Sequence, residues 1–387
     1  MLAAASITLT SCAKNDTVDD SKNKTPDANE NVTVAEGQLS FSDALDRLKE
    51  LEEMTELDKE QLLTVGKVPM SAMSVKYSTV ACNTYYSEDG NPDEETKQII
   101  EDEIKSYFAL NAAVVNLANE NGIGISEENF QTNIADNIDY FKESYGDDYA
   151  DIIEMYTLMS PYCYFESTLY NVFYSELTDY FYGQNGVAEN IEDIKTQVMD
   201  TMKEGNYVRA KHILISFPED IETDEEGNIP EAAKADTLAK ANEVLEKVNN
   251  GEDFDSLINE YGEDPGMKQN PDGYYFNEGV MVAPFEEATY ALNEGDTSDL
   301  VETSYGYHII KRLPISDDNA GFYSSDVYQQ AAYDAMSQML TDESASYEFE
   351  YTDGFDERQQ AFLDEYLAEQ QAAENAEAET DADGNVG

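Results

Sequence analysis

Apolar residues recur along this chain at two different spacings, and the spacing separates helical segments from strand-like ones. Apolar residues that recur every three or four positions predict helices over 41–63, 93–122, 126–145, 161–183, 186–205, 322–341 and 345–372. Ser42 and Ser126 stand at the starts of two of these segments and are predicted N-caps. Residues 74–86 are instead predicted to form a short strand.

In the middle of the chain, residues 206–314, predicted strands and helices alternate. A β-branched run from Val208 to Phe217 and a second run from Tyr305 to Leu313 predict two strands. Between them lie predicted helices over 230–251, 254–261 and 284–292, with short strands near 274–276 and 297–301. Pro230 and Gly251 occupy the usual start and stop positions of the first of these helices. The outline is therefore β-α-α-α-β.

The only two histidines of the chain, His212 and His308, lie in the middle of these two strand-like runs. Histidine is the side chain most readily recruited for proton or hydrogen-bond chemistry near neutral pH. Their matching positions suggest that the two rings meet. The alternative is that each is a core histidine that has found a hydrogen-bond partner.

The charge of the chain excludes one class of partner. The sequence has 22 Lys and Arg against 83 Asp and Glu, a net charge of −61. Because phosphate binding needs clustered basic residues, nucleic acids and anionic lipid surfaces are not expected to bind. A hydrophobic content of 41% is enough for a folded core, and the acidic segment 373–387 is expected to be a disordered tail.

The helix predicted over 161–183 is dense in tyrosine and phenylalanine and is apolar on most of its circumference. It is predicted either to be buried within an α-helical domain or to offer a partly exposed aromatic surface to unfolded polypeptide.

The first residues of the chain are predicted to be a membrane-targeting signal. Residues 1–12 end in Leu9-Thr10-Ser11-Cys12, which resembles the end of a truncated bacterial lipoprotein signal, with Cys12 as the lipidated residue. The alternative is an ordinary disordered terminus. Residues 13–40 are polar and would act as a tether. No other run has the roughly 18–20 continuous apolar residues of a membrane span, so contact with the membrane is expected only through the lipid.

Two further cysteines, Cys82 and Cys163, remain. They could form one disulfide or stay free, and the spacing does not decide between these.

Several motifs in residues 208–313 occur in the order found in one family. They are VRAKHILI around His212, NNGEDFDSLINEYGEDP with Asp264, and the stretch from Gly279 to Leu313, which contains Met281, Phe285, Thr303 and His308. Together they resemble the parvulin family of peptidyl-prolyl isomerases. The resemblance implies that His212, Asp264, Thr303 and His308 form the catalytic set and that Met281, Phe285 and Phe276 line the proline pocket.

One loop departs from the family pattern. Where parvulins commonly read GG-D-L-G-x-F, this chain reads NPDGYYF over 270–276, so the glycine pair and a pocket leucine are missing. Phe276 still aligns, and Tyr274 or Tyr275 is a candidate substitute for the leucine. The resemblance implies catalysis without a nucleophile, metal or cofactor. The surroundings are acidic and Lys268 is the lone nearby cation, so phosphorylated substrates are not expected.

The wider layout resembles that of secreted foldases of the PrsA type. It implies an α+β chain in which a parvulin-like domain, a small antiparallel sheet with flanking helices, is inserted between the N- and C-terminal segments of a helical chaperone-like domain. The expected parts are signal 1–12, tether 13–40, helical domain 41–205, parvulin domain 206–314, C-terminal helices 315–372 and tail 373–387.

This layout implies a lipid-anchored, extracytoplasmic isomerase that helps exported polypeptides containing X-Pro bonds to fold. The alternative is a holdase chaperone whose parvulin domain is weak or inactive.

Overall fold

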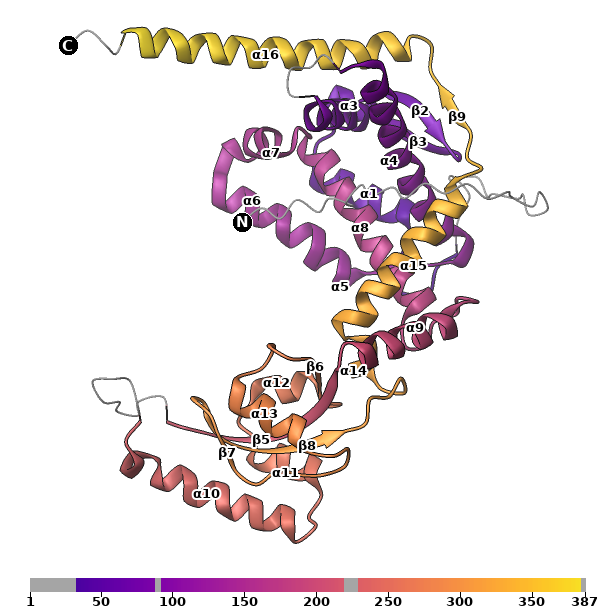
Figure 1. Cartoon of the computed structure of the whole chain (residues 1–387). Coiled ribbons are helices and arrows are strands. Elements are labelled where there is room, and N and C mark those ends of the chain that lie inside the picture. The colour runs from indigo at the N-terminus through magenta and orange to yellow at the C-terminus, as the bar shows by residue number, and fades with distance from the viewer. Residues whose placement is uncertain (1–32, 88–91, 219–228, 384–387) are drawn as a thin grey trace. The chain divides into compact units, whose positions relative to one another are not determined.

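The structure is a computed structural model that describes residues 33–87, 92–218 and 229–383. The chain divides into two compact units (Figure 1). The first contains residues up to 180 together with 336–387, and the second contains residues 181–335. None of the helices in the described part of the chain is both long and apolar enough to span a bilayer. Cys12 and most of the predicted tether lie outside the described residues.

The first unit is mainly helical. Its helices before the second unit are α1 (Phe41–Leu51), α2 (Glu56–Lys59), α3 (Ala72–Tyr86), α4 (Glu94–Asn121), α5 (Glu127–Phe130), α6 (Asp136–Tyr145), α7 (Tyr149–Thr157) and α8 (Pro161–Tyr182), with a π-helical turn at Gln131–Ala135 and a 3₁₀ turn at Gly146–Asp148. After the second unit come α15 (Asp326–Ser344), which spans the boundary, and α16 (Phe355–Asp383).

Two small sheets join distant segments of this unit. The strand β1 (Gln38–Leu39) pairs with β4 (Ile125–Ser126). The second sheet has the order β3-β2-β9, made of β3 (Val68–Ser71), β2 (Gln61–Val65) and β9 (Phe349–Tyr351). Because β9 comes from the C-terminal segment and α16 packs on α3, both ends of the chain contribute to one core.

The aromatic helix α8 is a core element. Phe165, Leu169, Phe173 and Leu177 are each at most 1% exposed, and no aromatic side chain of α8 is exposed. The structure therefore supports the buried helix, although Tyr164, Tyr174, Tyr180 and Phe181 of α8 are half-buried. Cys82 and Cys163 are both free and buried.

The segment predicted as a strand over 74–86 is helical, so that prediction was wrong. Its helix α3 is capped by Ser71, whose side chain accepts a hydrogen bond from the Ser74 amide. The polar side chains Asn83 and Thr84 donate back to carbonyls one turn earlier. Burial of α3 against α4 and α16 outweighs the weak helix propensity of its β-branched residues.

Other boundaries also differ from the prediction. The helix expected over 41–63 ends at Leu51, and residues 61–65 form β2 instead. Its N-cap is Ser40, which shares a capping box with Asp43, and not Ser42. The helix expected over 345–372 begins at Phe355 and continues to Asp383, into the segment expected to be a disordered tail.

The second unit contains a four-stranded antiparallel sheet of order β6-β5-β8-β7, which confirms the predicted fold class. Its strands are β5 (Val208–Ser216), β6 (Tyr274–Phe276), β7 (Val301–Glu302) and β8 (Gly306–Leu313). Its helices are α9 (Ile191–Glu204), α10 (Glu231–Asn249), α11 (Phe254–Tyr261), α12 (Pro265–Gln269), α13 (Ala283–Ala291) and α14 (Ala320–Tyr323).

The register of the two central strands brings the histidines to the same face. His212 is opposite Ile310, and His308 is opposite Leu214. Since side chains alternate between the faces of a strand, both rings lie on one face at diagonal positions, within reach of each other. The other face carries Ile213, Ile215, Tyr307 and Ile309, which pack in one core with residues of α10 and α11, and α12 and α13 lie on the histidine side (Figure 1).

Candidate active site

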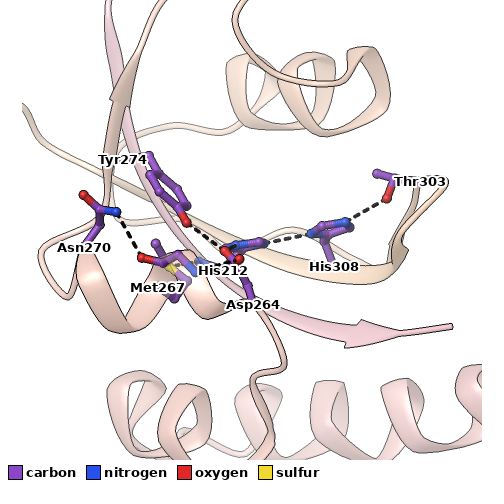
Figure 2. A network of polar contacts seen from close by, with 8 residues as sticks. His212, Asp264, Met267, Asn270, Tyr274, Thr303 and His308 are labelled. Atoms are coloured by element: carbon purple, nitrogen blue, oxygen red, sulfur yellow. Dashed lines mark hydrogen bonds and ion pairs between the residues drawn. The ribbon is translucent and has the colours of Figure 1, made fainter. Parts of the chain in front are cut away.

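Four residues predicted as a set form one hydrogen-bonded chain (Figure 2). The His212 Nδ1 and His308 Nδ1 atoms are 2.8 Å apart. The other nitrogen of His212, Nε2, is 2.7 Å from Asp264 Oδ2, and His308 Nε2 is 2.8 Å from Thr303 Oγ1. The two rings are nearly parallel, with an interplanar angle of 10°. The structure thus brings together residues that lie up to 96 positions apart.

Local structure orients both ends of this chain. Asp264 is the N-cap of α12, where its Oδ1 accepts a hydrogen bond from the Gly266 amide at 3.0 Å. Pro265 occupies the first turn of that helix, which suits its fixed φ. At the other end, Thr303 Oγ1 accepts a hydrogen bond from the Tyr305 amide at 3.1 Å, in the turn between β7 and β8. Neither end residue is free to turn away from the rings.

The hydrogen bonds have a single consistent direction. Three donors hold the pKa of the Asp264 carboxyl well below its usual range, the His212 ring first and then the Tyr274 hydroxyl and the Gly266 amide. An ionised Asp264 only accepts, so the Nε2 atom of His212 donates to it. A neutral His212 then accepts at Nδ1 from the Nδ1 atom of His308. The remaining His308 nitrogen, Nε2, then accepts from the Thr303 hydroxyl. In this arrangement each ring is held as one tautomer.

Burial keeps His308 neutral. Its side chain is 4% exposed, and burial, followed by the proximity of His212, lowers the pKa of His308 from 6.5 to about 3. Near neutral pH the network therefore contains an ionised Asp264 and an uncharged His308 imidazole. This suits rings that organise a site through hydrogen bonds and does not suit rings that shuttle protons.

A cleft of about 760 Å³ opens above the pair. Met281 and Phe285 both line it, and the Phe285 ring packs edge-on against both imidazoles, 5.1 Å from His212 and 5.4 Å from His308 between centroids. None of the described residues that line the cleft is lysine or arginine, and its carboxylates are Glu263 and Asp264. The cleft is an apolar space with an acidic edge.

The altered NPDGYYF loop places its three aromatic residues in three different surroundings. Tyr274 lines the cleft and its hydroxyl reaches Asp264, so of the two candidate substitutes for the leucine it is the one that faces the cleft. Phe276 is 1% exposed and lies behind Phe285, with ring centroids 6.0 Å apart, so it supports the wall without lining the cleft. Tyr275 points elsewhere and donates to the Ser316 carbonyl.

Sequence reasoning missed several residues that line the cleft. They are apolar or aromatic residues around its opening, namely Leu214, Val280, Val282 and Tyr305. Of these, Val280 and Tyr305 are 62% and 61% exposed. The alternation of β5 could have identified Leu214, which lies two residues after His212. The residues of the opening gave no comparable signal, because exposed turns have no periodicity.

This sheet, its flanking helices and the hydrogen-bonded chain define a parvulin-type peptidyl-prolyl isomerase domain. Residues 195–314 match the family model described as the PPIC-type PPIASE domain. Over 203 residues, 45% of this chain, the sequence is 35% identical to Foldase protein PrsA 3 of Bacillus anthracis and covers 72% of that protein. The chain belongs to the PrsA family of foldase proteins.

Other relatives match over shorter stretches. Foldase protein PrsA 3 of Bacillus cereus is 37% identical over 154 residues, which is 38% of this chain and 47% of that protein. The chain thus spans about half the length of this relative. The crystal structure of PrsA from Bacillus subtilis is 21% identical and aligns with 70% of this chain and 85% of its own, at a TM-score of 0.30.

Proposed function

We propose that the second unit catalyses cis-trans isomerisation of X-Pro bonds in unfolded polypeptides. The observation that carries this proposal is the closed chain from Thr303 through His308 and His212 to Asp264 at the floor of an apolar cleft. Rotation about an X-Pro bond is opposed by amide resonance, with a barrier of about 18–20 kcal/mol. Each tenfold acceleration needs about 1.4 kcal/mol of selective stabilisation of the twisted bond, and no covalent step.

The surroundings of the cleft offer two sources of that stabilisation. Met281 and Phe285 would hold the proline ring away from water, where the charge-separated planar amide is disfavoured relative to the twisted amide. Asp264 keeps its negative charge next to this apolar wall, with its side chain 21% exposed. A fixed charge in such surroundings acts on the polar carbonyl more strongly than it would in water. The two imidazoles keep the carboxylate and the floor in place.

Substrates are proposed to be unphosphorylated around the proline. A phosphate needs clustered basic side chains, and the described residues that line the cleft include none. The nearby Lys240 is already paired, with its Nζ 2.6 Å from Glu263 Oε1. The apolar residues Val280 and Tyr305 at the opening are suited to uncharged residues that flank the proline.

A peptide isomerisation assay tests both points. The full-length protein should accelerate isomerisation of an unphosphorylated Ala-Pro peptide. His308→Ala should reduce kcat/KM by at least about tenfold, because it removes the hydrogen bonds that link His212 to Thr303. The matched peptide with phosphoserine before proline should be the poorer substrate. A wild-type rate equal to that of His308→Ala, or to the uncatalysed rate, would refute the isomerase proposal.

A second candidate function is binding of unfolded chains by the first unit. One observation favours it, since Tyr140, Met155 and Tyr156, on α6 and α7, are each more than 60% exposed. Replacing all three with serine should weaken suppression of client aggregation. Tyr85→Ser is the matched control, because Tyr85 is 81% exposed on a different helix. Equal suppression by the triple variant and the wild type would reject this surface.

We also propose that the protein works outside the cytoplasm, attached through a lipid on Cys12 and acting on exported polypeptides. The motif at Leu9–Cys12 supports this. Metabolic labelling with a radioactive fatty acid should mark the wild-type chain and leave Cys12→Ser unlabelled. Labelling of both would contradict the assignment of Cys12.

A further inference from the structure

The hydroxyl of Tyr274 shares a carboxylate oxygen with the histidine pair. It donates to Asp264 Oδ2 at 2.8 Å, the same oxygen that accepts from His212 Nε2 at 2.7 Å (Figure 2). The other oxygen of Asp264 accepts from the Gly266 amide at 3.0 Å. Asp264 is therefore held by donors from β5, β6 and its own helix, and Tyr274 is the one donor that comes from the altered loop.

The neighbouring backbone leaves room for this hydroxyl. A Cβ atom added at Gly266 would lie 2.0 Å from Tyr274 Oη, far inside contact distance, and 3.3 Å from Asp264 Oδ1. A glycine at this position therefore accommodates the tyrosine oxygen. The next residue, Tyr275, points to the opposite side of β6, where it bonds to Ser316 and Asn319.

We propose that Tyr274 is a positioning residue, whose hydroxyl orients the Asp264 carboxylate and through it fixes the tautomers of His212 and His308. This role rests on the isomerase function proposed above and goes beyond a substitute for the missing pocket wall. A wall needs only the ring of Tyr274. Orientation of Asp264 needs its oxygen, because a carboxylate held by three donors cannot turn without breaking one of them.

Three single substitutions in the whole chain separate these roles. Tyr274→Phe keeps the ring and should lower kcat about tenfold with little change in KM, as expected for one hydrogen bond to a charged acceptor. Gly266→Ala should reproduce this loss, because the added methyl displaces the hydroxyl. Tyr275→Phe is the matched control and should retain the wild-type kcat. Thermal unfolding confirms that each variant is folded.

A spectroscopic measurement reads the position of Asp264 directly. Because the chain has only two histidines, ¹⁵N-histidine labelling gives signals from His212 and His308 alone. In the wild type His212 should have its proton on Nε2. In Tyr274→Phe and Gly266→Ala that proton should exchange with water about tenfold faster, since Asp264 holds it less firmly.

The positioning role is overturned if Tyr274→Phe keeps the wild-type kcat and proton exchange, or if Tyr275→Phe loses as much as Tyr274→Phe. Wild-type exchange in Gly266→Ala would overturn it as well. A wild-type chain without isomerase activity would refute the proposed function instead, and the proton-exchange comparison would still decide whether Tyr274 orients Asp264.

Discussion

Acidification from pH 7 to pH 4 should destabilise the unit that carries the histidine pair, because His308 is held neutral in the folded chain. Its pKa is lowered from 6.5 to about 3, chiefly by burial. Below pH 6.5 the unfolded chain therefore binds a proton at this residue while the folded chain does not. The stabilisation is complete above pH 6.5 and is lost progressively as the pH falls toward 3.

The size of the effect follows from this difference. At pH 4 the solution is about 2.5 pH units below the ordinary pKa of 6.5 and still above the folded pKa of about 3. Each pH unit corresponds to about 1.36 kcal/mol, so the free energy of unfolding should fall by about 3 kcal/mol. Asp264 contributes little in this window, because its pKa is lowered from an ordinary value of 3.8 and most of its effect lies below pH 4.

The comparison of wild type with His308→Gln isolates this residue. Urea unfolding of both chains, followed by circular dichroism between pH 7 and pH 4, should show a difference in unfolding free energy that changes by about 3 kcal/mol. Groups that do not touch the His308 network cancel in this difference. Glu166, whose pKa burial raises to about 7, acts in the opposite direction and equally in both chains. The same pH dependence in both chains would show that His308 is not held neutral.

Three further predictions concern single side chains. Thr303→Val should lower kcat/KM about tenfold while Thr303→Ser retains most of it, because valine leaves the buried His308 Nε2 without its donor; equal rates in the isomerisation assay would contradict this. Phe285→Ala should cost roughly 3–5 kcal/mol of unfolding free energy in urea, and a loss below about 1 kcal/mol would show that the ring is not packed on the pair. Burial raises the pKa of the Cys82 thiol to about 11 and that of Cys163 well above its usual value. Iodoacetamide at pH 8, with labelling followed by mass spectrometry, should therefore modify both at least about 100-fold more slowly in the folded chain than in urea. Rapid labelling of the folded chain would contradict the burial.

Much of the second unit was predictable because its signals are local. The β-branched runs around His212 and His308 predicted the two central strands, and Pro230 and Gly251 bracket a helix that spans Glu231–Asn249. In the first unit local signals were less reliable. The segment 74–86 looked like a strand and is helix α3, because its burial against α4 and α16 outweighs its own propensity.

The residues of the candidate active site also differ in how far the sequence alone could assign them. Motif order along the chain was enough to select Asp264, Thr303 and the histidines, which the structure places in one hydrogen-bonded chain. It was not enough to assign the two tyrosines of the altered loop. Tyr274 and Tyr275 are adjacent and chemically identical, and only the pairing of β6 with β5 decides which of them faces Asp264.

By itself, then, the sequence determined the two central strands of the second unit, because β-branched runs are a signal of short spacing. Its motifs, through their resemblance to the parvulins, selected the four residues of the network. Tertiary structure alone decided that residues 349–351 complete a sheet with residues 61–65, and that the Tyr274 hydroxyl meets the carboxylate that holds His212. The physical reason is common to both. A hydrogen-bond partner that is distant in sequence is selected by strand register and packing. Neither of these can be read from patterns that span only a few neighbouring residues.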